Sequence, residues 1–438
     1  MTANARTQIE RRLVCAACGR VFGDREAIAD CPACGGLLDV RVVIDAGLGP
    51  ELRRRFDAPR ALSGPPYESS GVWRFRELVL EASDAEIVSF PEGHTPLIDA
   101  PSVAAWAGCE ALLLKHEGMN PTGSFKDRGM TVGVTQARRV EARAVACAST
   151  GNTSASLAAY AARAGLPALV LVPRGQVALG KLTQTLAYGA RTLMVAGDFD
   201  TCLALAREAS ARLGVYLLNS VNPFRVEGQK TIAFELLQQL GWDPPEWIAL
   251  PAGNLGNTAA LGKALVEARE AGLITRMPRL LAVQAAGAAP FATSFAQDFR
   301  ERPVVRAETR ATAIRIGDPA SFERGVAAIR ATDGFVTAVS DDAIMDAKAA
   351  VDRAGVGCEP ASAAAVAGVR EARAQGIIGR NERVVAILTG HVLKDPGALV
   401  WYHQEAIPAP SGRNAPVEIE PRLEAVEREL ARMAPPRA

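Results

Sequence analysis

The sequence predicts an α/β protein whose parallel sheets are covered by helices on both faces. From residue 91 onward, short apolar runs alternate with alanine-rich segments of helical composition. Strands buried on both faces read as near-continuous apolar runs, whereas half-exposed strands alternate apolar and polar residues. The runs that we interpret as strands lie at residues 111–115, 143–149, 167–173, 191–197, 247–253, 279–287 and 383–390. Because ligands of such folds bind at the carboxyl ends of the strands, we expect the functional residues there.

The composition is that of an ordinary soluble protein. The 438 residues include 49 basic and 48 acidic side chains, so no broad charged surface for nucleic acid or membrane is expected. No stretch approaches the ~20 apolar residues of a membrane span. The opening residues, "MTANARTQIERRL", lack the apolar segment of a secretory signal. The cysteine pattern, two pairs and four scattered singles, favours a reducing, cytoplasmic location over a disulfide framework.

A cysteine cluster near the start predicts a structural metal site. Cys15, Cys18, Cys31 and Cys34 form two CxxC turns in the segment "CAACGRVFGDREAIADCPACGG". Two such turns supply four thiolates, the ligand set of a closed tetrahedral Zn²⁺ site. A redox pair or an iron site are the alternatives. Because four thiolates leave no open coordination position, we expect a structural zinc without a catalytic role.

The pattern along the chain divides it into four parts. We expect a zinc ribbon at 1–40, a poorly patterned arm or linker at 41–90, an α/β core at 91–408, and a tail at 409–438. The tail contains "PRLEAVERELARMA", whose apolar residues recur at helical spacing. We expect it to form a packing helix.

One lysine occupies an unusual position. The segment "NPTGSFKDRGM" places Lys126 just after a Pro-Thr-Gly-Ser turn, at the predicted first turn of a helix. A cation is disfavoured there, because the helix dipole is positive at its N-terminus. Either Lys126 is solvated and unimportant, or it is not a free ammonium.

Four polar clusters follow predicted strands. The first, "STGNTSAS", presents hydroxyls and free N–H groups at a helix start and suits an anion, although an ordinary capped helix has the same pattern. The second, "GNLGN", lets backbone N–H groups approach a phosphate, and it matches neither a Walker loop nor GxGxxG. In the third, "NSVNPFRVEGQKT", Arg225 either clamps a second anion or is solvated. The fourth, "LTGHVLKDP", begins with the hydroxyl of Thr389 at a strand end.

Together these features suit one cofactor. Pyridoxal phosphate needs a lysine for its Schiff base, a phosphate cup and a partner for its ring nitrogen. A Lys126 bound to the cofactor is no longer a mobile ammonium, which resolves the conflict with the helix dipole.

The motifs "NPTGSFKDRGM", "ASTGNTSAS", "NSVNPFRVEGQKT", "PAGNLGN", "ATAIRIGDPAS" and "LTGHVLKDP" resemble those of the threonine synthase family. The resemblance spans residues 85–405 and implies pyridoxal-phosphate fold type II (tryptophan synthase β-like), two open twisted α/β domains with the active site between them. It implies that Lys126 is the Schiff-base lysine and main proton shuttle, with Phe125 beside the cofactor ring. It further implies that Asn152 bonds the phenolic oxygen and Thr389 the pyridine nitrogen.

The resemblance also implies two phosphate sites and a carboxylate site. The cofactor phosphate is expected at Gly253, Asn254, Leu255, Gly256 and Asn257. The substrate carboxylate or phosphate is expected at Ser149, Thr150 and Thr153. The phosphate of the family's substrate, O-phospho-L-homoserine, is expected at Asn219, Ser220, Arg225 and the side chain of Asn254. The family is commonly homodimeric.

Two departures leave alternatives open. Val392 stands where we expect the family's glycine, and many family members lack an N-terminal ribbon. A related enzyme such as cysteate synthase, acting on O-phosphoserine and sulfite, also needs a phosphate site. A non-catalytic binding protein on the same fold is a third reading. Lys181, after a predicted strand, is a further candidate for substrate contact, and the four scattered cysteines are expected to be buried packing residues.

Overall fold

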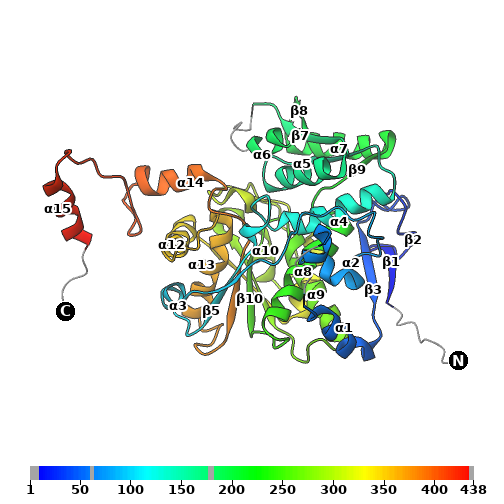
Figure 1. The fold of residues 1–438 in the computed structure, drawn as a ribbon, viewed down its shortest axis with the longest axis horizontal. Coiled ribbons are helices and arrows are strands. Elements are labelled where there is room, and N and C mark those ends of the chain that lie inside the picture. Colours follow the sequence, from blue (N-terminus) through cyan, green and yellow to red (C-terminus); the bar gives the residue numbers. More distant parts are fainter. Residues whose placement is uncertain (1–8, 60–63, 176–181, 434–438) are drawn as a thin grey trace. The chain divides into compact units, whose positions relative to one another are not determined.

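The computed structural model describes residues 9–59, 64–175 and 182–433. The chain forms two units that divide after Asp395. The first unit contains an N-terminal ribbon and two sheets with their helices (Figure 1). The second unit, from Pro396 onward, is described separately below.

The ribbon is a three-stranded antiparallel sheet in the order β2-β1-β3. Its strands are β1 (Glu10–Cys15), β2 (Val21–Phe22) and β3 (Leu38–Val43). The first CxxC turn joins β1 to β2, and the second precedes β3. Strand β3 therefore extends past residue 40, where we expected the ribbon to end.

The segment expected to be an arm or linker folds against the core. It contains α1 (Gly49–Phe56) and α2 (Arg76–Val79). Phe56 and Phe75 are fully buried and their ring centroids lie 4.9 Å apart in an edge-to-face arrangement. They belong to the same hydrophobic core as one face of the larger sheet. The sequence showed little pattern here because the segment consists of short helices of four to eight residues and single 3-10 turns rather than long periodic elements.

The larger sheet has six strands in the order β12-β11-β10-β13-β5-β4, and only the β4–β5 pair is antiparallel. Five of the strands are β5 (Leu112–His116), β10 (Trp247–Pro251), β11 (Arg279–Ala285), β12 (Phe335–Val339) and β13 (Val384–Leu388), and the sixth is the short edge strand β4 (Leu97–Asp99). Alternate residues of each central strand enter different cores: Ala249 joins one core, whereas Ile248 and Leu250 join the other. Burial on both faces explains the near-continuous apolar runs.

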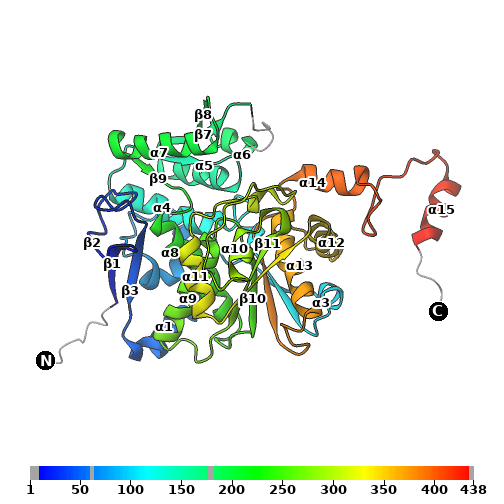
Figure 2. The same cartoon turned by 180° about the vertical axis from the view of Figure 1, so that it is seen from behind.

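Helices cover both faces of this sheet (Figures 1 and 2). One face carries α3 (Pro101–Ala107), α12 (Asp341–Arg353) and α13 (Pro360–Ala374). The other carries α8 (Pro223–Gln239), α9 (Gly256–Glu270) and α11 (Phe322–Ala331). The short helix α10 (Pro290–Phe295) contacts β11 and β12.

The smaller sheet has four parallel strands in the order β8-β7-β6-β9. They are β6 (Ala144–Ala148), β7 (Ala168–Pro173), β8 (Arg191–Val195) and β9 (Val215–Leu217). Its helices are α4 (Lys126–Arg139), α5 (Asn152–Ala164), α6 (Thr183–Ala187) and α7 (Phe199–Leu213). One prediction fails here: the apolar run at 191–197 is not buried, since Met194 is 63% exposed. Strand β8 is the edge of the sheet, and its position there could not be read from its composition.

The second unit contains α14 (Pro396–Val400), a π-helical turn (Trp401–Glu405) and α15 (Leu423–Met433). The predicted tail helix therefore exists, but Leu423, Val426 and Leu430 on it are exposed. Its packing role remains a prediction. Within the described ranges, none of the helices is both long enough and apolar enough to cross a membrane.

Candidate active site

Two distant motifs meet at the first turn of α4. The turn before this helix pairs with the loop after β13 through a bridge between Ser124 and Gly390. The N–H of Phe125 donates to the carbonyl of Thr389 at 3.0 Å, and the N–H of His391 donates to that of Gly123 at 2.9 Å. Lys126, the first residue of α4, is thereby held beside Thr389.

A close helix crossing brings Arg225 toward the same point. Helices α4 and α8 are in extensive contact. A Cβ added at Gly129 would lie 2.9 Å from the Arg225 carbonyl oxygen, and one at Gly133 would lie 3.1 Å from Arg225 Cγ. Glycine is required at these two positions because a larger residue would push the helices apart. The crossing places the Arg225 guanidinium where its charge acts on Lys126.

Lys126 has the electrostatic character of a nucleophilic amine. Its side chain is half-buried, and its Nζ lies 4.1 Å from the centroid of the Phe125 ring. Desolvation, reinforced by the positive charge of Arg225, lowers the pKa of Lys126 to about 7, and Glu359 opposes the shift. A neutral amine does not conflict with the positive helix end. The position that is unfavourable for an ammonium is therefore suited to a lysine that reacts as a free base.

Buried ionic groups fix the start of α4. The Arg128 guanidinium pairs with Glu117 at 2.6 Å and with Glu235 at 2.8 Å, and all three side chains are buried. Asp127 accepts hydrogen bonds from the Thr122 hydroxyl and from Ser156 of α5, each at 2.6 Å. These contacts explain why Asp and Arg follow the lysine: they anchor its helix on both sides.

The glycine-asparagine loop after β10 forms a cradle for an anion. Leu255 adopts a left-handed conformation (φ 63°), and α9 begins at the next residue, Gly256. Four buried polar atoms around the start of this helix have no hydrogen-bond partner in the described structure: Asn257 Oδ1 and Nδ2, Thr258 Oγ1 and Ser321 Oγ. Free N–H groups at a helix start and unpartnered buried donors are the features of a phosphate site.

The predicted second phosphate site lies next to this cradle. Asn254 Nδ2 donates to Ser220 Oγ at 2.6 Å. Arg225 is fully buried and its Nη1 donates to the carbonyl of Leu218 at 2.9 Å, whereas its Nε and Nη2 have no partner in the described structure. Asn219, also predicted for this site, has its amide bonded to β6: its Oδ1 accepts from the N–H of Ala148 and its Nδ2 donates to the Ala148 carbonyl, each at 3.1 Å.

The STGN segment lies at the other side of the site. Asn152 begins α5, and Ser149, Thr150 and Thr153 are half-buried with it. Asn152 Nδ2 donates to Glu359 Oε2 at 3.0 Å. The structure thus connects this loop to a residue that the sequence reasoning missed.

Glu359 and Ser362 were not predicted. Glu359 precedes α13 and is buried, and its Oε1 lies 3.3 Å from the Thr389 hydroxyl. Ser362 Oγ lies 2.9 Å from the same hydroxyl. The segment "GCEPAS" carried one usable signal, an acidic residue directly before a helix-starting proline, but nothing in the sequence links it to Lys126.

Comparisons with known proteins agree with this geometry. The model of the family "Pyridoxal-phosphate dependent enzyme" matches residues 88–390. Threonine synthase of Methanocaldococcus jannaschii is 43% identical over 399 residues, which are 90% of this chain and 95% of that protein. Threonine synthase of Mycobacterium tuberculosis is 46% identical over 361 residues, 81% of this chain and 98% of that protein. This chain belongs to the threonine synthase family of pyridoxal-phosphate-dependent enzymes.

Solved structures support the same fold. Threonine synthase from Escherichia coli matches with a TM-score of 0.69 at 19% identity, covering 95% of this chain and 94% of that one. A threonine deaminase isoform from Solanum lycopersicum matches with a TM-score of 0.61 at 23% identity, covering 70% and 86%. The predicted fold type II of the threonine synthase family is confirmed.

The residues of this threonine synthase family member fit pyridoxal phosphate. The cradle at Asn257 offers unpartnered buried donors to the cofactor's phosphate, and Lys126 offers an amine of lowered pKa to its aldehyde. Thr389, which is buried, and Asn152 supply a hydroxyl and an amide on the elements next to Lys126. No acidic side chain is part of the cradle as described, which suits an anionic ligand.

The lowered pKa of Lys126 leads to a testable prediction. Only the neutral amine attacks the cofactor's aldehyde, so the rate of cofactor loading should rise tenfold per pH unit below about 7 and level off above it. An ordinary lysine would give a midpoint near ~10.4. Stopped-flow absorbance of the cofactor-free protein mixed with pyridoxal phosphate measures this midpoint. A midpoint near that of free lysine would contradict the assignment.

The four N-terminal cysteines form a compact cluster. Their Sγ atoms all lie within 4.8 Å of one another, with Cys15 to Cys34 at 3.5 Å and Cys18 to Cys31 at 3.7 Å. Tetrahedral Zn²⁺ with Zn–S bonds of ~2.3 Å separates its sulfurs by about 3.8 Å. The geometry therefore fits the predicted ligand set.

The four scattered cysteines and Lys181 were the remaining residues singled out in the sequence. The four remaining cysteines are buried, as expected: Cys109, Cys147, Cys202 and Cys358. Lys181 lies outside the described residues.

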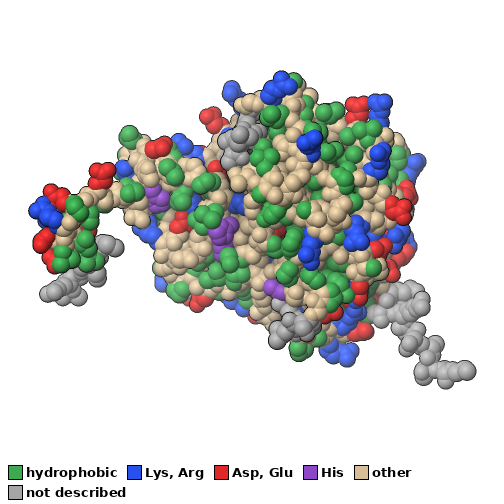
Figure 3. All heavy atoms as spheres, turned by 45° about the horizontal axis from the view of Figure 1, so that its top comes forward, with side chains coloured by type: hydrophobic (Ala, Val, Ile, Leu, Met, Phe, Trp, Pro, Cys, Tyr) green, Lys and Arg blue, Asp and Glu red, His purple; other side chains and the backbone are tan. Residues whose placement is uncertain are grey.

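The face of the molecule drawn in Figure 3 carries basic and acidic side chains interspersed with one another.

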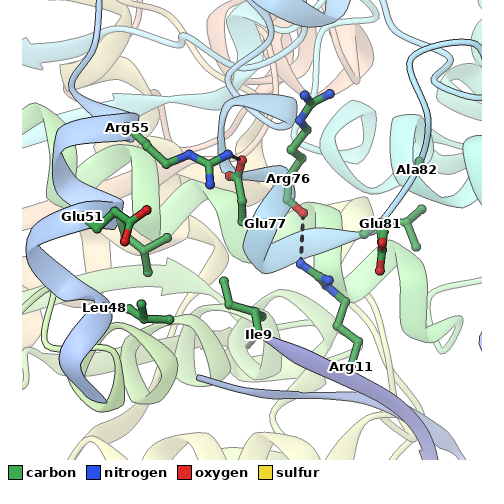
Figure 4. A pocket seen from close by; sticks show the side chains of 11 residues that line it. Ile9, Arg11, Leu48, Glu51, Arg55, Arg76, Glu77, Glu81 and Ala82 are labelled. Atoms are coloured by element: carbon green, nitrogen blue, oxygen red, sulfur yellow. Dashed lines mark hydrogen bonds and ion pairs between the residues drawn. The ribbon is translucent and has the colours of Figure 1, made fainter. Parts of the chain in front are cut away.

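A cavity of about 300 Å³ lies away from this site, between β1, α1 and α2 (Figure 4). Two of its charged side chains have partners there: Arg55 pairs with Glu77, and Arg11 Nη2 donates to the main-chain carbonyl of Arg76 at 3.4 Å. We interpret it as a packing gap beneath the arm.

Proposed function

We propose that this chain is a threonine synthase, which converts O-phospho-L-homoserine and water into L-threonine and phosphate. The observation that carries the proposal is Arg225, a buried guanidinium with two unpartnered nitrogens next to a phosphate cradle and a lysine of lowered pKa. An enzyme that dehydrates free threonine needs a single phosphate cup, for its cofactor. A second buried cation beside that cup supports a substrate that carries its own phosphate.

The side chains of the site have different roles in the proposed reaction. Lys126 would hold the cofactor. Its Nζ, freed when the substrate's amine takes its place, would accept the proton from Cα, release that proton again, and only then accept one from Cβ. Bound pyridoxal phosphate supplies the electron sink that makes these protons acidic. Arg225, Ser220 and Asn254 hold the γ-phosphate and stabilise the charge it carries away. Ser149, Thr150 and Thr153 would bind the substrate carboxylate at the start of α5.

Product analysis tests the function. The purified protein loaded with pyridoxal phosphate is given O-phospho-L-homoserine, and in parallel O-phospho-L-serine with and without sulfite. Threonine and phosphate in equal amounts from the first substrate are expected. Turnover of phosphoserine alone would assign the site to a related enzyme such as cysteate synthase.

We also propose that the ribbon binds one structural Zn²⁺. The ribbon is tied to both sheets' helices: Asp24 pairs with Arg139 of α4 at 2.9 Å, and Asp39 with Lys263 of α9 at 3.0 Å. Loss of the metal should therefore loosen the ribbon from the helices that flank the site.

The substitution Cys18→Ser tests the zinc proposal. We expect loss of zinc from metal analysis and a decrease in the free energy of unfolding of about 3 kcal/mol or more, because metal binding energy contributes directly to folding. Cys109→Ala, which removes a thiol outside the ribbon, should retain the zinc. Full zinc content in the Cys18→Ser protein would contradict the ligand assignment.

We further propose a cytoplasmic homodimer. The buried scattered thiols are compatible with a reducing compartment, and the family commonly forms dimers. Light scattering on the cofactor-loaded protein would measure the mass of the assembly.

A further inference from the structure

The carboxyl of Glu359 connects two residues that are expected to bond different polar atoms of the cofactor ring. It accepts from Asn152 Nδ2 at 3.0 Å and lies 3.3 Å from Thr389 Oγ1. Its backbone is fixed too, because its N–H donates to the carbonyl of Gly390 at 3.0 Å. The side chain is 4% exposed. Solvent therefore cannot replace either of these two partners.

The donor and the acceptor of each hydrogen bond around Thr389 can be assigned one after the other. Ser362 Oγ accepts from the N–H of Gly390 at 2.9 Å, so its own hydrogen is available to Thr389 Oγ1, also at 2.9 Å. Thr389 then has one hydrogen to donate and one lone pair left. In this structure that hydrogen goes to Glu359.

Binding of the cofactor would change the hydrogen-bond partners of the Glu359 carboxylate. If Thr389 donates to the pyridine nitrogen, the carboxylate loses its Thr389 donor. Asn152 carries two amide hydrogens, so it can bond the phenolic oxygen and still donate to the carboxylate. The Thr389 oxygen and a carboxylate oxygen would then face each other as two acceptors 3.3 Å apart in a buried site. Two facing acceptors repel each other, and a buried carboxylate that has lost a donor is costly to keep ionised. A proton on the carboxyl removes both problems.

We propose that Glu359 takes up a proton from solvent when pyridoxal phosphate binds, and that it then donates to Thr389 and directs the Thr389 hydroxyl toward the pyridine nitrogen. Glu359 is thus a positioning residue, acting through Thr389. The proposal rests on the proposed function only in assigning this cofactor and its two ring contacts to the site.

The surroundings of Glu359 support this exchange. Burial raises the pKa of Glu359, and the hydrogen bond from Asn152 and the charges of Lys394 and Lys126 oppose the rise. Cys358, the neighbouring thiol, has a raised pKa and is neutral. Cofactor binding removes the Thr389 hydrogen bond, which is one of the contributions that hold the carboxyl ionised. The remaining dominant effect is burial, which favours the acid.

The pH dependence of cofactor affinity tests the proposal. The dissociation constant of pyridoxal phosphate is measured across alkaline pH for the wild type and for Glu359→Gln, whose amide donates to Thr389 without titrating. We expect the wild-type affinity to fall about tenfold more per pH unit than that of Glu359→Gln, since only the wild type must acquire the extra proton. Ser362→Ala removes a neighbouring hydrogen bond without removing the titrating group, so it should keep the wild-type slope.

Parallel slopes for the wild type and Glu359→Gln would overturn the proposal. A difference infrared spectrum of the wild type, cofactor-bound minus cofactor-free, needs no variant. A new carbonyl band of a protonated carboxyl is expected, and its absence would also overturn the proposal. Both measurements omit substrate. A protein with the expected slope that leaves O-phospho-L-homoserine unchanged would refute the proposed function alone.

Discussion

Replacing Lys126 with alanine should reduce threonine formation by at least ~10³-fold, because the substitution removes both the covalent attachment point and the proton acceptor. The visible absorbance of the cofactor should disappear after gel filtration. Lys126→Arg serves as the matched variant: it restores a cation at the start of α4 but cannot bond to an aldehyde, so it should be equally inactive.

Mass spectrometry identifies the attachment point directly. Borohydride reduction of the wild-type holoenzyme, followed by peptide mapping, should place the cofactor on the peptide that contains Lys126. Lys115 is the informative competitor: it is buried and its Nζ is committed to Gln239 at 2.8 Å and to the carbonyl of Thr95 at 2.7 Å. Finding the label on Lys115 would reject the assignment of Lys126.

Replacing Arg225 with methionine should raise the stability of the protein and lower its activity. Burial lowers the pKa of Arg225 to about 10, and two of its nitrogens have no partner in the described structure. A buried charge that is incompletely paired costs stability, so an apolar side chain of similar length should raise the free energy of unfolding by about 1 kcal/mol or more. At the same time kcat/KM for the phosphorylated substrate should fall by at least ~10²-fold.

Urea denaturation of the cofactor-free proteins and steady-state kinetics of the loaded ones measure the two effects. Arg212→Met is the control, because Arg212 lies on α7 in an exposed pair with Glu208 and should change neither quantity. If Arg225→Met lowers stability and activity together, Arg225 is a structural residue and the second phosphate site must be sought elsewhere. Unchanged activity would equally remove it from the site.

Seven strands of the two larger sheets and the four loops were predictable because their signals are local, whereas β4, β9 and β12 were not among the predicted runs. A strand buried on both faces must be apolar throughout, as β10 and β13 are. Each CxxC turn brings its own two thiolates close by local backbone geometry, and a glycine-rich loop before a helix exposes N–H groups wherever it occurs. Strand β8 shows what such local signals cannot predict, because an apolar run does not reveal whether the strand lies at the centre or at the edge of a sheet.

The sequence by itself determined the fold class, the cysteine cluster and the residues of each loop, since each depends on neighbours in the chain. Only the tertiary structure decided that Arg225 approaches Lys126, because this depends on glycines that let α4 and α8 pack closely. It also decided that Glu359 lies between Asn152 and Thr389. These three residues come from separate segments, and their hydrogen bonds exist only once both sheets have placed their carboxyl ends together. The energies that shift the pKa of Lys126 are likewise burial and long-range charge, which a linear pattern does not contain.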